Sequence, residues 1–137
     1  MKSLFRSSLL VLALLSLPVT IATAKPRPAP EPDAVVTIND VRYPVFTTES
    51  LKPLKTKRPI YPKEARRDEV QGNALVVVLV DPAGMPREVS LKLSEPTPAF
   101  GEAALAAVKQ WKFRPYVWNG EPAAYIIQVP VAFRFAD

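Results

Sequence analysis

The final stretch of the chain, residues 125–135, most constrains the fold. Its alternate positions are wholly apolar, while the intervening ones carry Gln128, Pro130 and Arg134. This period of two predicts a half-buried β-strand. Pro130 has no amide hydrogen to donate to a ladder, which predicts a strand at a sheet edge or a bulge. An edge strand is a place where another chain can bind. The apolar positions are Tyr125, Ile127, Val129, Val131, Phe133 and Phe135.

The composition excludes several function classes. The sequence of 137 residues has room for one domain, and it contains 16 prolines but no cysteine and no histidine. Disulfides, His or Cys metal ligation and Ser/His or Cys/His catalysis are therefore excluded. The carboxylates Glu88, Glu95, Glu102 and Glu121 show no convergent pair. We expect no enzyme, no cofactor and no metal site, and the mild formal charge of +5 gives no ground for a nucleic-acid partner.

The first 24 residues have the pattern of a Sec-type signal peptide. Lys2 and Arg6 precede an apolar run at residues 9–15, and Ala22-Thr23-Ala24 is a cleavage site of the Ala-x-Ala type. The alternative is an uncleaved membrane anchor, because residues 7–24 are about as long as the ~17 residues of a minimal span. Either way, the rest of the chain is expected beyond the inner membrane.

Residues 25–57 are predicted to be a proline-rich, basic linker. The prolines at residues 26–32 favour an extended polyproline segment. Within the linker, residues 35–38 and 41–46 flank Asn39-Asp40, a pattern typical of a short hairpin. A basic run follows, which fits a solvated surface or contact with anionic lipid headgroups or a cell-wall polymer. The run contains Lys52, Lys55, Lys57, Arg58, Lys63, Arg66 and Arg67.

The remaining sequence predicts helix, strand, strand, helix, strand. A short helix is expected at residues 62–67, a strand buried on both faces at 74–80, and an alternating strand at 87–94. Thr97 and Pro98 begin a helix that continues through Lys112 and buries Trp111. We therefore predict an α+β fold with a three-stranded mixed sheet in the order 2-1-3, both edges open, and two helices on one face.

Several motifs in combination resemble the C-terminal domain of the TonB family. They are Arg58-Pro59-Ile60-Tyr61-Pro62, the valine-rich strand after Gly72, the Trp111-x-Phe113-x-Pro115 helix ending, Asn119-Gly120-Glu121-Pro122 and Val129-Pro130-Val131-Ala132-Phe133. The resemblance covers residues 58–135, and the domain is assigned to residues 58–137. It implies a TonB C-terminal-like fold in the periplasm.

The resemblance also implies a function. Domains of this family grip extended segments of outer-membrane receptors, the TonB boxes, by adding them to the last strand. The implied peptide-binding residues are Arg58, Ile60, Tyr61, Tyr125, Ile127, Gln128, Val129 and Val131. An alternative for the aromatic and aliphatic side chains among them is that they fill the core, so that mostly backbone binds.

The chain departs from a full transducer in its cleavable-looking leader, its short arm and its lack of histidine. We therefore expect a free-standing periplasmic domain. One alternative is a self-associating envelope scaffold, for example a homodimer. Another is a short energy transducer, anchored in the inner membrane and coupled to the motor proteins there.

Overall fold

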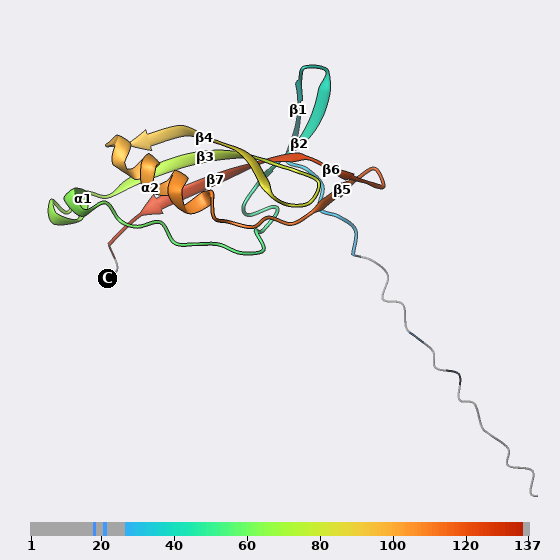
Figure 1. Cartoon of the computed structure of the whole chain (residues 1–137), viewed down its shortest axis with the longest axis horizontal. Helices are drawn as coiled ribbons and strands as arrows, with labels where there is room; N and C mark the ends of the chain where they lie inside the picture. Colours follow the sequence, from blue (N-terminus) through green and yellow to red (C-terminus); the bar gives the residue numbers. More distant parts are fainter. Residues whose placement is uncertain (1–17, 19–20, 22–26, 136–137) are drawn as a thin grey trace, which may run out of the picture.

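The computed structural model describes residues 18, 21 and 27–135. The described part forms a five-stranded mixed sheet with α2 (Pro98–Val108) packed on one face (Figure 1). Figure 1 shows a separate ribbon of β5 (Tyr116–Trp118) and β6 (Glu121–Ala123) at one end of the sheet, and α1 (Lys63–Arg67) at the other end. No helix among the described residues is long and apolar enough to cross a membrane. The predicted signal peptide lies outside the described residues, apart from Pro18 and Ile21. The elements are β1 (Ala34–Ile38), β2 (Val41–Thr47), α1 (Lys63–Arg67), β3 (Gly72–Val80), β4 (Pro86–Glu95), α2 (Pro98–Val108), β5 (Tyr116–Trp118), β6 (Glu121–Ala123) and β7 (Tyr125–Phe133).

The predicted core of the sheet is confirmed. β3 lies between β4 and β7 and pairs antiparallel with both, which is the 2-1-3 order. Its alternate residues Ala74, Val76, Val78 and Val80 are buried beneath the helices. The intervening residues lie on the opposite face of the sheet and are partly exposed, so the expectation that this strand is buried on both faces is wrong. Both sets are apolar, which explains why the segment showed no alternation.

The sheet has two strands more than expected, because the predicted hairpin joins it. β1 and β2 are linked by Asn39 and Asp40, which have positive φ angles of 49° and 63° and make a two-residue turn. β2 then pairs in parallel with β7. The reason is burial: Pro44, Val45 and Phe46 are apolar and enclosed by the fold. The expectation of an open edge along the whole last strand is therefore wrong.

The second helix begins as predicted and ends earlier. The Thr97 side chain accepts a hydrogen bond from the Ala99 N–H at 3.2 Å, with Pro98 in the first turn. The helix ends at Val108 rather than Lys112, because the backbone of Lys112 pairs with the segment at Lys55 in an antiparallel bridge. Trp111 is consequently half-buried, and its indole N–H donates to the Lys57 carbonyl at 2.9 Å.

Candidate peptide-binding site

The two sides of β7 are covered to different extents. On one side β3 pairs with the whole strand, from Tyr125 to Phe133. On the other side β2 pairs only with residues 126–128. The outer side of residues 129–133 has no strand partner among the described residues. The predicted binding edge is therefore half occupied and half free.

Pro130 lies in the free half, and its nitrogen faces away from β3. The orientation follows from two bonds on the other side of β2. The Asp33 N–H donates to the Val45 carbonyl, and the Thr47 N–H donates to the Asp33 carboxylate, each at 2.9 Å. The backbone groups of Val45 and Thr47 therefore point towards β1. Phe46 between them must therefore face β7, and in this register it meets the backbones of residues 126 and 128. Alternation along β7 places Pro130 and Ala132 on the same outer side. No register shift interrupts the β3–β7 ladder at Pro130.

β2 is held firmly against β7. The Phe46 ring is fully buried, with edge-to-face contacts to Tyr116 and Tyr125 at centroid distances of 4.8 and 5.6 Å. Asp33 clamps the end of the strand, because its carboxylate also accepts the Ser50 hydroxyl at 2.7 Å. These bonds, from Ser50 first and the Thr47 N–H second, lower the pKa of Asp33. A guest strand cannot reach residues 126–128 unless this packing opens.

The structure separates the predicted site residues of β7 by face. Tyr125, Ile127 and Val129 are fully buried, and Val131 packs against the same core. The Tyr125 hydroxyl donates to the Arg114 carbonyl at 2.8 Å, and burial raises the pKa of this phenol. Gln128 is exposed on the opposite face. A peptide lying alongside β7 in the free half would therefore meet mostly backbone.

The three predicted binding residues that precede α1 lie in two different places. Tyr61 packs edge-on against Phe133 and stacks on Phe135, with ring centroids 5.7 and 5.2 Å apart, so it lies at the far end of β7. Its hydroxyl donates to the Val70 carbonyl. Arg58 and Ile60 instead line a shallow hollow of about 80 Å³ beside α2. Only Tyr61 among them is brought to the free half of β7.

A groove on the open face of the sheet was not predicted. The β1–β2 hairpin forms one wall of a cavity of about 340 Å³ above β3, β4 and β7. Its apolar lining comes from Ile38, Tyr43, Val77, Leu79 and Ile126, and its polar lining from Asn39, Glu88, Ser90 and Lys92. The sequence carried no signal for this groove, since it depends on where the hairpin docks.

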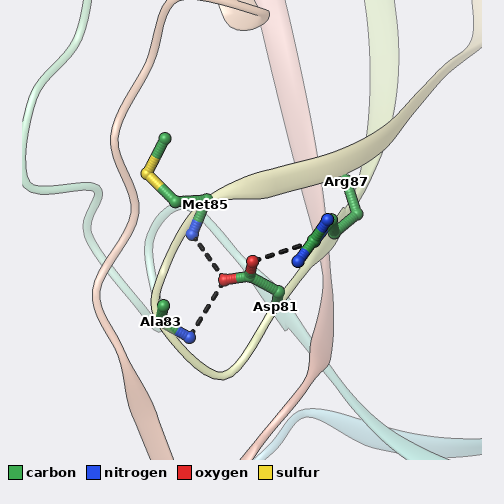
Figure 2. Close-up of polar contacts among 4 residues, drawn as sticks. All are labelled: Asp81, Ala83, Met85 and Arg87. Atoms are coloured by element: carbon green, nitrogen blue, oxygen red, sulfur yellow. Dashed lines mark hydrogen bonds and ion pairs between the residues drawn. The ribbon is translucent and has the colours of Figure 1, made fainter.

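The turn between β3 and β4 contains an acid with a structural task. Figure 2 shows that one oxygen of Asp81 accepts the Ala83 and Met85 N–H groups, both at 2.9 Å, while the other meets Arg87 Nε at 2.9 Å. The Met85 N–H first, and the Arg87 side chain after it, lower the pKa of this carboxyl. The described residues hold no group of three or more acids that could bind a metal ion.

Comparison with known proteins gives consistent matches to one family. The sequence profile described as Gram-negative bacterial TonB protein C-terminal matches residues 57–135. Protein TonB of Vibrio cholerae serotype O1 is 35% identical over 77 residues, which are 56% of this chain and 32% of that protein. Protein TonB of Xanthomonas campestris pv. campestris is 39% identical over 75 residues, 55% of this chain and 34% of that protein. The chain thus matches about a third of the length of these curated relatives.

One solved structure supports the fold. The solution structure of the Pseudomonas aeruginosa TonB C-terminal domain superposes with a TM-score of 0.54 and 22% sequence identity. The superposition covers 75% of this chain and 96% of that one. At this identity the likeness concerns the fold alone.

Proposed function

The chain belongs to the Gram-negative bacterial TonB protein C-terminal family, and from this premise we propose that it binds extended peptide segments of outer-membrane receptors in the periplasm. The peptide is added as a further strand to the sheet. The process served is TonB-dependent transport or a related envelope process. The names of its relatives support transport. Since the match covers only about a third of the length of these relatives, the activity of the whole protein is part of the proposal.

The free outer side of β7 carries the proposal. A guest strand at residues 129–133 would continue the line of β2, which ends at the Thr47–Gln128 pair. The backbone groups that face it are the Pro130 carbonyl and both polar groups of Ala132. Each main-chain hydrogen bond contributes roughly 1 kcal/mol net, so this edge supports a modest affinity. Tyr61, next to Phe133, marks where such a peptide would leave the sheet.

Substitution of Ala132 by proline tests this site. The change removes the one outward N–H in the free half and leaves the ladder to β3 intact. The measurement is fluorescence anisotropy with labelled 12-residue N-terminal segments of outer-membrane receptors, against scrambled peptides. We expect Ala132→Pro to weaken binding by about fivefold, the equivalent of roughly 1 kcal/mol. Val131→Pro is the matched control, because it removes an N–H that faces β3 and should destabilise the fold instead.

The same assay distinguishes the two edges on this side of the sheet. The outermost strand is β1, and its turn at Asn39-Asp40 makes Ile38 and Val41 a hydrogen-bonded pair, so the N–H of Thr37 faces outward. If Thr37→Pro weakens binding and Ala132→Pro does not, the peptide is added to β1. Equal binding of receptor and scrambled peptides by the folded parent chain would contradict the proposal as a whole.

A self-associating envelope scaffold is the second candidate. It is favoured by the β1–β2 hairpin, which stands out from the body of the domain in Figure 1 and exposes 38–51% of Val36, Ile38 and Val41. Long apolar edges invite edge-to-edge pairing. Sedimentation velocity from low to high protein concentration tests it. A dimer that Ile38→Lys abolishes supports the scaffold, whereas a monomer at all concentrations contradicts it.

A membrane-anchored transducer is the remaining form of the proposal, and it depends on the leader. N-terminal sequencing of the chain from soluble and membrane fractions tests it. We expect a soluble periplasmic chain that begins at Lys25. An intact leader in the inner-membrane fraction would instead favour a short transducer that engages the motor proteins.

A further inference from the structure

Two segments without any acidic residue lie side by side on the surface of this domain. Residues 50–63 and 103–120 contain no aspartate or glutamate, although the whole chain has 13. Backbone bonds join them: the Leu54 and Lys55 N–H groups donate to the Lys112 carbonyl at 2.9 and 3.1 Å, and the Lys112 N–H donates to the Lys55 carbonyl at 2.9 Å. The segment predicted as a linker is therefore fixed to the chain that follows α2.

The junction of these segments concentrates positive charge. Lys55 and Lys112 are direct partners in an antiparallel bridge, where like charges destabilise the pairing. The Arg114 guanidinium reaches the Lys52 carbonyl at 3.0 Å, and Lys57 Nζ reaches the Gln110 side chain at 2.8 Å. We call the exposed set Lys52, Lys55, Lys57, Lys109, Lys112 and Arg114 the basic band.

In the described part of the chain, no acidic side chain forms an ion pair with a cation of the basic band. Among the described residues the ion pairs are Arg67–Asp68 and Arg87–Asp81, and neither includes a member of the band. A repulsive arrangement of fixed cations is relieved by an external anion, and several cations at once call for an extended anionic surface. A small anion would meet only one or two of them.

Exposed aliphatic side chains lie along the same segment. Leu54 is 56% exposed and directly precedes Lys55, and Ile60 is 80% exposed. Large aliphatic side chains among lysines are typical of surfaces that lie in the interface of a membrane, where the apolar groups enter the acyl boundary and the cations meet phosphates. A soluble acidic peptide would leave these side chains in water.

We propose that the basic band docks the domain onto a membrane surface that contains anionic phospholipids. The cations bind the headgroup phosphates, and Leu54 enters the acyl boundary between them. The interaction is peripheral and reversible, and it weakens with ionic strength because the charges are solvent-exposed. It is independent of the proposed peptide site, which uses the backbone of β7.

Vesicle co-sedimentation of the chain from Lys25, the form that we expect after export, tests this proposal. The vesicles contain 30% phosphatidylglycerol in phosphatidylcholine, or phosphatidylcholine alone. Binding to the anionic vesicles should exceed binding to the neutral ones and should fall on raising NaCl from 0.05 to 0.5 M. The double variant Lys55→Gln/Lys112→Gln should bind anionic vesicles about tenfold or more weakly, since each cation near such a surface adds roughly a factor of five.

Matched variants make the result specific. Arg66→Gln/Lys92→Gln removes the same charge outside the band and should change vesicle binding less than twofold. Leu54→Ser should weaken it with the charge unchanged. Thermal unfolding midpoints within a few degrees of the parent show that each variant is folded. Equal loss of vesicle binding in both double variants would overturn the proposal. A second assay measures retention of the chain on poly-glutamate beads. Retention there without any binding to vesicles would overturn the proposal in favour of an acidic protein partner.

Discussion

Gly84 occupies a turn position where a side chain meets both an unfavourable backbone angle and a neighbouring atom. Its φ angle is +87°, and a Cβ atom there would come within 2.5 Å of the Phe113 carbonyl oxygen. Gly120 has a similar φ angle of +84° but nothing within 4 Å. Gly120→Ala should therefore lower the free energy of unfolding by roughly 1–2 kcal/mol, the backbone term alone. Gly84→Ala should lower it by more, and urea denaturation compares the two; equal losses would contradict the predicted clash.

The lowered pKa of Asp81 predicts how the free energy of unfolding changes with pH. Folding lowers the pKa of this carboxyl, chiefly through the Met85 N–H. Its contribution to stability is therefore complete at neutral pH, declines as the pH falls below the ordinary value of 3.8, and is lost below the pKa of the folded state. Asp81→Asn keeps an acceptor for the turn but cannot titrate or pair with Arg87. Urea midpoints measured from pH 6 to pH 2.5 should fall less steeply for this variant than for the parent chain. Parallel curves would contradict the assignment.

β2 lies in the segment that was expected to be a linker, yet it is part of the folded sheet. Phe46 is fully buried between Tyr116 and Tyr125, so Phe46→Ala should lower the free energy of unfolding by about 3–5 kcal/mol. Val36→Ala in the neighbouring strand is the control. Its side chain is 38% exposed, and the loss should be within about 0.5 kcal/mol. Chemical denaturation measures both. A Phe46→Ala variant as stable as the control would mean that the hairpin is not part of the fold.

The elements also show what the sequence can predict. Local signals were sufficient for the turn at Asn39-Asp40, the Thr97 cap and the alternation of β7, because each depends on neighbours in the chain. The pairing of β2 with β7 joins residues about 80 positions apart, so no pattern in the neighbouring sequence indicates it. The same reason explains the end of α2: the bridge from Lys55 to Lys112 is a tertiary contact, and the helical spacing through Trp111 gave no sign of it.

At the scale of the whole molecule, the hairpin moves the outermost edge of the sheet from β7 to β1. The candidate site predicted from sequence was a single open edge with Pro130 in either orientation. In the fold, the free edge of β7 is limited to residues 129–133, where Pro130 faces outward, and β1 provides a second edge. The sequence alone was sufficient to predict that a partner would bind mainly through the backbone of the last strand, and that Pro130 lacks an N–H donor there. The extent of the site could not be predicted, because that depends on which segment docks beside β7.

The boundary of the folded unit follows from the same packing and can be tested by truncation. The sequence placed the domain at residues 58–137, yet Phe46 and Leu51 belong to the core that β3, α2 and β7 form. A fragment of residues 58–137 exposes the rings of Tyr116 and Tyr125, which Phe46 covers, and it loses the apolar burial of β2. Its thermal unfolding midpoint, followed by near-ultraviolet circular dichroism, should be at least 10 °C below that of residues 27–137, as expected for a loss of several kcal/mol from a small domain. Equal midpoints would restore the hairpin to the linker and would return the whole outer side of β7 to the peptide.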